Sequence, residues 1–236
     1  ESTQTATKTA IVELAKQLSI ISFDLVFEDP ITTFLESNVF FQFNPQLTTL
    51  SLNSIQSEVN TVVENYFANT VGEFDKAFRR SNLLTLVDDV SPAVLSSRAD
   101  IKMQQRITPS SIVQDFNLRF PASILEPDDI NYVVTTTTFI FNSKVCMIRN
   151  RLNTNKLEVV SITDQVIQID NIGSYNPTAG TLNITGLSVE SVVGGVDFLK
   201  ISLVPSNQSS IITERNDIVV YDNGPSFTSG IITTST

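Results

Sequence analysis

Acidic side chains gather at one place in the sequence, Glu126-Pro127-Asp128-Asp129. Two adjacent aspartates in a loop that contains proline supply the oxygen ligands that Ca²⁺ and Mg²⁺ prefer. The spacing lacks the alternating acids and the glycine of an EF-hand loop. Adjacent carboxylates also do not form the cleft of about 5–9 Å that a carboxylate hydrolase needs. We therefore predict a solvated turn whose aspartates cap their own backbone, with no metal site and no cofactor.

Histidine, the commonest metal ligand and the usual general base near neutral pH, is absent from all 236 residues. Ser-His-Asp triads, Cys-His pairs and histidine zinc sites are therefore excluded. The single cysteine, Cys146, lies in an apolar run, and we expect it to be a buried small hydrophobe. The sequence predicts that the chain is not an enzyme.

The pair Gly194-Gly195 lies between two extended runs. It lacks the downstream Gly-Lys-Ser/Thr of a phosphate-binding loop. Two glycines in this position favour a type I′ hairpin turn, because both central residues of that turn need positive φ.

Basic residues form a stripe in a chain whose 25 acidic and 15 basic residues give a net charge of −10. The stripe is too short for a nucleic-acid track and lacks aromatic residues for base stacking, and the net charge repels nucleic acid and anionic membranes. Two alternatives remain, an ordinary solvated face or a docking face for an acidic partner. The candidate interface residues are Arg79, Arg80, Arg98, Lys102 and Arg106.

The composition favours extended structure with uncharged surfaces. Hydrophobic residues make up 41% of the chain and charged residues only 17%, below the roughly 25% of typical soluble domains. Uncharged surfaces are buried against partners at a lower desolvation cost than charged ones. No run approaches the ~20 apolar residues of a membrane span, so we expect no membrane partner.

Periodicity predicts helices and strands in the first half of the chain. Apolar residues spaced as in a helix predict one helix over residues 7–18 and a second from residue 53, with Asn53 as the cap and Gln56 three residues on. The spacing of Phe74, Ala77 and Phe78 predicts the start of a short helix. Ser81 is expected to cap a further helix. Strands are predicted at residues 23–27, 38–43 and 94–107.

The strand over residues 94–107 alternates between an apolar and a polar face. The apolar face holds Leu95, Ala99, Ile101, Met103 and Ile107. We place a domain boundary after it, near residue 110, which makes residues 22–110 an α+β module of short helices on a small sheet. Residues 1–21 form a separate N-terminal helix.

Residues 111–225 carry about nine short extended runs separated by turn residues, which predicts a β-rich sandwich or a partly closed barrel. The runs are residues 116–120, 132–141, 145–152, 157–162, 166–169, 181–185, 189–193, 196–204 and 218–221. Residues 226–236 are polar, and we predict a flexible tail.

Three stretches together resemble a known family. They are residues 74–81 (FDKAFRRS), residues 95–106 (LSSRADIKMQQR) and residues 171–181 (NIGSYNPTAGT). They are similar to the baseplate wedge proteins of contractile-tailed bacteriophages, and more narrowly to the baseplate J-like subunit of the inner ring around the tail hub.

The resemblance implies a structural protein of the virion tail, assembled in the cytoplasm of the bacterial host. Copies would pair with one another and close a six-fold ring, and they would contact other wedge proteins and the sheath-initiating protein. It also implies that the N-terminal helix continues from a longer upstream part. The alternative is a carbohydrate- or receptor-binding tail fibre module, which the absence of tryptophan disfavours.

Overall fold

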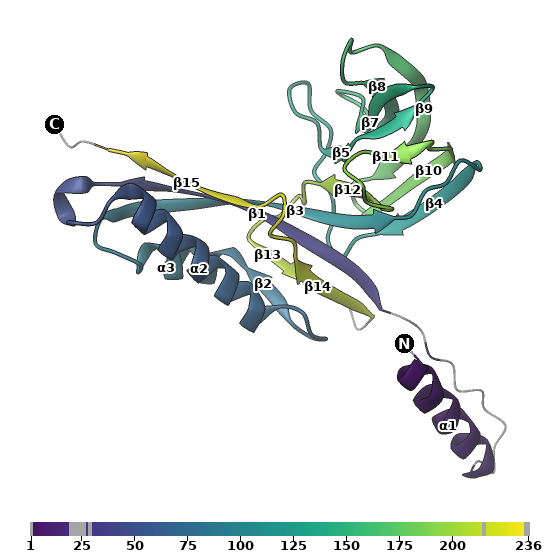
Figure 1. Ribbon diagram of the computed structural model, residues 1–236, viewed down its shortest axis with the longest axis horizontal. Helices are drawn as coiled ribbons and strands as arrows, with labels where there is room; N and C mark the ends of the chain where they lie inside the picture. The colour runs from purple at the N-terminus through teal and green to yellow at the C-terminus, as the bar shows by residue number, and fades with distance from the viewer. Residues whose placement is uncertain (1, 19–26, 28–29, 214–215, 234–236) are drawn as a thin grey trace. The chain divides into compact units, whose positions relative to one another are not determined.

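The computed structural model of the chain describes residues 2–18, 27, 30–213 and 216–233 (Figure 1). The chain divides into two compact units, Glu1–Ile31 and Thr32–Thr236. The first unit holds helix α1 (Ser2–Leu18), which confirms the helix predicted over residues 7–18. The strand predicted at residues 23–27 lies outside the described residues, apart from Phe27.

The second unit is an α+β fold built on one large mixed sheet with a β-rich C-terminal part, as predicted. Its main path runs β14-β1-β3-β12-β5-β7-β8-β9-β10-β4, and β6, β11 and β15 pair off this path. A separate two-stranded sheet joins β13 to β2. The strands are β1 (Ile31–Phe43), β2 (Ala77–Arg79), β3 (Val94–Ile107), β4 (Gln114–Arg119), β5 (Val134–Thr136), β6 (Phe139–Phe141), β7 (Lys144–Asn150), β8 (Lys156–Ser161), β9 (Ile167–Asn176), β10 (Thr181–Leu187), β11 (Ser191–Val192), β12 (Leu199–Leu203), β13 (Ser210–Ile212), β14 (Asp217–Tyr221) and β15 (Phe227–Ile232).

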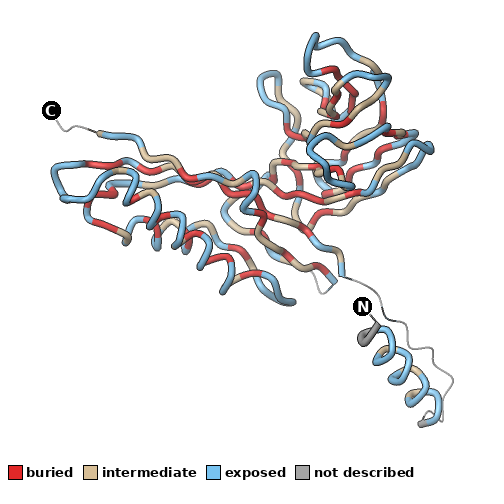
Figure 2. Tube along the Cα trace, viewed as in Figure 1, coloured by how far each residue is buried: buried red, intermediate tan, exposed pale blue. Residues whose placement is uncertain are grey.

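Helices α2 (Leu52–Thr70) and α3 (Arg80–Asp88) lie side by side along one face of the sheet formed by β1, β3 and β15 (Figure 1). A short 3₁₀ helix, η1 (Pro45–Leu47), precedes α2. The buried residues of α2 repeat every three or four positions, because that spacing keeps them on one side of a helix. They join the core below β1, and Figure 2 shows the buried stretches following the sheet and the inner sides of both helices. The members from α2 are Ile55, Val59, Val63, Tyr66 and Phe67.

Both helices begin at positions other than those predicted. The cap of α2 is Ser51, whose hydroxyl accepts from the Ser54 N–H at 3.2 Å, so the assignment of Asn53 as the cap was wrong. Helix α3 follows β2 without a side-chain cap, and Ser81 is not its cap. The backbone N–H of Arg80 instead donates to the carbonyl of Ser209.

The short helix predicted at Phe74, Ala77 and Phe78 is wrong, since residues 77–79 form strand β2. β2 pairs antiparallel with β13, which is more than 130 positions away in the sequence. The Tyr66 hydroxyl fixes the same segment by donating to the Arg79 carbonyl at 2.8 Å and accepting from its N–H at 3.1 Å. Distant pairing therefore overrides the local helical spacing.

Strand β3 confirms the strand predicted over residues 94–107. Four of the five residues assigned to its apolar face are buried: Ala99, Ile101, Met103 and Ile107. Leu95 is the exception and is 45% exposed. It lies beside the irregularity where β1 shifts register between Gln42 and Phe43, and a bulge of this kind breaks the alternation of faces.

The turn at Gly194 and Gly195 has positive φ at both residues, as predicted, with values of 101° and 72°. The prediction of a hairpin at this turn is wrong. In the described structure, the strand before the turn, β11, pairs with β6, whereas the strand after it, β12, pairs with β3 and β5.

The last strands of the chain return to the first part of the sheet. β12 pairs with β3, and β14 and β15 pair with β1. Residues 226–236 were predicted to be a flexible tail, and their described part contains β15, which runs parallel to β1 from Phe227 to Ile232. The division of the chain near residue 110 stays a prediction of the sequence. None of the described helices is long and apolar enough to cross a membrane.

Candidate interaction surface on the sheet

The sheet formed by β1, β3 and β15 carries the helices on one face and presents its other face to solvent; we call the latter the open face. Register places residues of the three strands beside one another there: Phe40 of β1 lies opposite Arg98 of β3 and opposite Ser229 of β15. The open face comprises Asn38, Phe40, Gln42, Ser96, Arg98, Asp100, Phe227, Ser229 and Ile231.

Arg98 is the exposed cation of this face, with 66% of its side chain accessible. Its guanidinium lies over the ring of Phe40, with Cζ 4.1 Å from the ring centroid. One terminal nitrogen is 3.2 Å from a carboxylate oxygen of Asp100. The Phe40 ring is packed edge-to-face against Phe227 of β15, with the ring centroids 5.4 Å apart. The stack holds the guanidinium against the sheet and leaves its outer side accessible.

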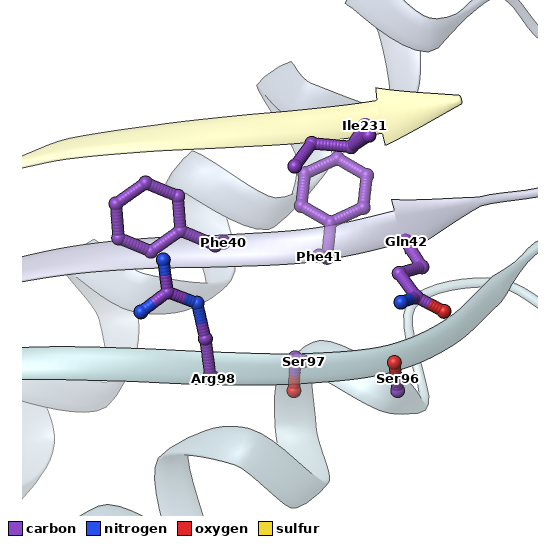
Figure 3. A pocket seen from close by; sticks show the side chains of 7 residues that line it. All are labelled: Phe40, Phe41, Gln42, Ser96, Ser97, Arg98 and Ile231. Atoms are coloured by element: carbon purple, nitrogen blue, oxygen red, sulfur yellow. The ribbon is translucent and has the colours of Figure 1, made fainter. Parts of the chain in front are cut away.

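A shallow groove crosses the open face between β15 and β3 (Figure 3). Ile231 lies on one side of it, Arg98 and Ser96 lie on the other, and Phe40 and Gln42 lie between them. Ile231 is 61% exposed and Phe227 is 47% exposed. The groove thus places an apolar wall opposite a cation.

The other candidate interface residues have different surroundings. Arg106 lies between two rings, with its Cζ 3.7 Å from the centroid of Phe34 and 4.7 Å from that of Phe198. The guanidinium of Arg80 lies 3.4 Å from the carbonyl of Ala99. Lys102 is half-buried and faces Glu36 across the ladder.

Arg79 has an exposed side chain, on β2 rather than on the open face. The structure therefore keeps Arg98, Lys102 and Arg106 on one face of β3 and places Arg79 and Arg80 outside this strand, and of the five only Arg98 lines the groove. Their role as an interface stays a prediction.

A buried polar cluster, which the sequence did not predict, joins four strands around Arg106 at one end of the stripe. One carboxylate oxygen of Asp222 accepts from Lys200 Nζ at 2.6 Å, Arg106 at 2.9 Å and Gln104 Nε2 at 3.1 Å. Burial raises the pKa of the Asp222 carboxyl, but these hydrogen bonds outweigh burial, so its pKa lies below the usual value. Gln104 also donates to Glu36 Oε1 at 2.6 Å.

The same face of β1, β3 and β12 carries four members of the cluster, Glu36, Gln104, Arg106 and Lys200. The fifth member, Asp222, directly follows β14. Alternation placed Gln104 and Arg106 on the polar face of β3, but no local signal pointed to Asp222, which is 116 positions from Arg106. The cluster satisfies its own donors and acceptors, and so we assign it to stability.

The acidic loop forms a turn capped by Asp128, which confirms the predicted capping for one of its two aspartates. Asp128 Oδ1 accepts from the backbone N–H of Ile130 at 2.8 Å, and Oδ2 accepts from Asn131 Nδ2 at 3.0 Å. The backbone N–H of Asn131, followed by its side chain, makes the largest contribution to holding the pKa of Asp128 below its usual value. In the part of the chain that the structure describes, no group of three acidic or cysteine side chains is placed to hold a metal ion.

Cys146 is buried, as predicted, with no measurable exposure. Burial raises the pKa of its thiol, which keeps the sulfur protonated near neutral pH. Cys146 therefore contributes to the core as a small hydrophobe.

Residues 32–106 match a family described as baseplate structural protein gp6, C-terminal domain III. The match supports the interpretation of the chain as a phage baseplate protein. It begins in β1 and ends in β3, so it contains α2, α3 and two of the three strands of the open face. No curated protein matches the chain.

The gp6-like match supports a structural role in the baseplate, a place in the virion tail and contacts with other baseplate components. A structural role of this kind also fits a protein without catalytic activity. The carbohydrate- or receptor-binding alternative has no support from it.

Proposed function

We propose that the chain is a wedge subunit of the inner ring of a contractile-tail baseplate, of the baseplate J-like kind, and that it acts through contacts with its own copies and with other wedge proteins. The observation that carries the proposal is the match of residues 32–106 to the gp6 domain. The resemblance of residues 74–81, 95–106 and 171–181 to wedge subunits agrees with it. Assembly takes place in the host cytoplasm, and the sheath-initiating protein is one of the partners.

The architecture suits this role physically. The sheet face opposite α2 and α3 exposes two large apolar side chains and one cation, Phe227, Ile231 and Arg98. Contiguous apolar patches rimmed by polar residues are typical of surfaces that are covered in an assembly. The low content of charged residues reduces the cost of covering the rest of the surface.

The first experiment measures the mass of the purified chain by light scattering over a range of concentrations. Contacts between copies predict dimers or larger rings, and a strict monomer at high concentration would overturn that part of the proposal. The second experiment reverses charge at the predicted interface in the double variant R98E/K102E, and follows baseplate assembly by electron microscopy of tails from infected cells.

We expect the double variant to lower the yield of complete baseplates. Its loss of thermal stability should be small and should come from K102E, because Arg98 is exposed whereas Lys102 lies opposite Glu36. The matched control is R151E. Arg151 is an exposed arginine in a single ion pair with Asp170 at 3.0 Å, on the β-rich part of the chain. Normal assembly of R98E/K102E tails would make the basic stripe an ordinary solvated face.

A further inference from the structure

The groove on the open face presents a cation whose donors are only partly used. Arg98 directs one terminal nitrogen to Asp100, at 3.2 and 3.4 Å from its two oxygens. No other described residue accepts a hydrogen bond from the guanidinium. The ring of Phe40 supports the planar group from below, so little freedom is lost when a further acceptor binds.

The opposite wall of the groove is apolar and belongs to β15. Ile231 faces the groove, and Phe227 lies four residues earlier on the same side of the strand. No residue from Asn223 to Thr236 is charged. A side chain lying between Ile231 and Phe40 would therefore bury apolar surface without burying an unpaired charge.

We propose that this groove binds an acidic peptide segment of another baseplate protein, with an apolar side chain against Ile231 and Phe40 and a neighbouring carboxylate on Arg98. A carboxylate matches the paired N–H groups of a guanidinium, which makes this the preferred charged partner. Nucleic acid fits poorly, because Arg98 is a single exposed cation on this face, whereas binding of a phosphate backbone depends on several Lys and Arg contacts. The inference rests on the proposed assembly role and names the chemistry of one partner.

The test uses a displayed library of random twelve-residue peptides, selected on the purified chain and counter-selected on R98E. We expect the selected peptides to combine an aspartate or glutamate with an aromatic or branched apolar residue nearby. Binding of the synthesised peptides is then measured by fluorescence anisotropy against the wild type, R98E, R98K, I231S and the control R151E.

We expect R98E to weaken binding by about tenfold or more, and R98K by about threefold to tenfold, because lysine keeps the charge but not the paired geometry. I231S should weaken binding by about threefold to tenfold through lost apolar contact. R151E should bind as the wild type does, and replacing the acidic residue of the peptide with its amide should reproduce the loss seen in R98E.

Three results would overturn the proposal. They are selected peptides without an acidic residue, peptides that bind R98E as tightly as the wild type, and self-association of the wild type that R98E abolishes. The last would make a second copy the occupant. Because the selection uses no other baseplate protein, its failure leaves the wedge assignment standing. Conversely, peptide binding with normal assembly of R98E/K102E tails would separate the groove from the wedge role.

Discussion

The guanidinium of Arg106 lies 2.9 Å from the carboxylate of Asp222, although 116 positions separate them in the sequence. Asp222 is 9% exposed, and the same oxygen accepts from Lys200 at 2.6 Å. Two cations therefore share one buried anion where the last part of the chain meets β3 and β12. Removing one partner from such a cluster leaves charges without compensation.

We predict that D222N destabilises the fold by about 2–4 kcal/mol, because Arg106 and Lys200 lose their shared anion. Urea denaturation followed by circular dichroism measures the change. The control is D170N, which breaks the exposed Arg151–Asp170 pair and should cost less than about 1 kcal/mol. Equal effects of the two variants would contradict the assignment of the cluster to stability.

The same carboxylate makes stability depend on pH at the acidic end. The pKa of Asp222 is lower in the folded state than its usual value near ~3.9, so the folded state prefers the ionised form. The resulting stabilisation is complete above the unfolded-state pKa and disappears as pH falls through the folded-state pKa.

The free energy of unfolding, measured from pH 6 down to pH 2.5, should therefore fall more steeply in the wild type than in D222N below about pH 4. The difference between the two proteins should be constant above about pH 5. If the stability difference between the wild type and D222N grew as the pH falls, the pKa of Asp222 would be raised rather than lowered in the folded state, which would contradict this prediction.

We predict that G230A is destabilising by about 1–3 kcal/mol through overpacking. A Cβ atom at Gly230 would lie 2.4 Å from Leu52 Cδ1 and 2.7 Å from the ring of Phe41, whose side chain is buried. Thermal unfolding of G230A, of L52A and of the double variant G230A/L52A measures the effect. The double variant should lose less than the sum of the two single changes, since L52A removes one of the two clashes. Additive losses would show that Gly230 is required for another reason.

We predict that Y66F costs about 1–2 kcal/mol, because the hydroxyl bonds both the carbonyl and the N–H of Arg79. This pair of bonds ties α2 to the start of α3. The control is Y132F, whose ring is partly exposed and contacts Arg149. Chemical denaturation should separate the two variants, and an unchanged midpoint in Y66F would remove this role from Tyr66.

Strong periodicity made some elements predictable from the sequence. Strand β3 alternates from Arg98 to Met103, and the apolar residues of α2 follow one helical side, so local pattern and tertiary position agree. Strand β2 shows the opposite case. Its three residues carry helical spacing, and only pairing with β13 defines them as a strand.

Only one side of the groove on the open face was predictable from the sequence, because only β3 carries a strong local pattern. Arg98 was identified because it lies on the polar face of a strongly patterned strand. Ile231 and Phe227 were assigned to a flexible tail, because six uncharged residues with a glycine carry no signal strong enough to predict a strand. Their position depends on β1, nearly 190 residues earlier.

The parallel pairing of β15 with β1 also bears on how the protein is made. β1 leaves the ribosome long before its neighbours β14 and β15, which follow it by more than 170 residues. The sheet that carries the groove is therefore incomplete until β15 has been made, and its closure joins segments of large sequence separation, which slows folding. A chain that terminates before β15 would lack the apolar wall of the groove, so that only subunits extending through β15 would present it to a partner.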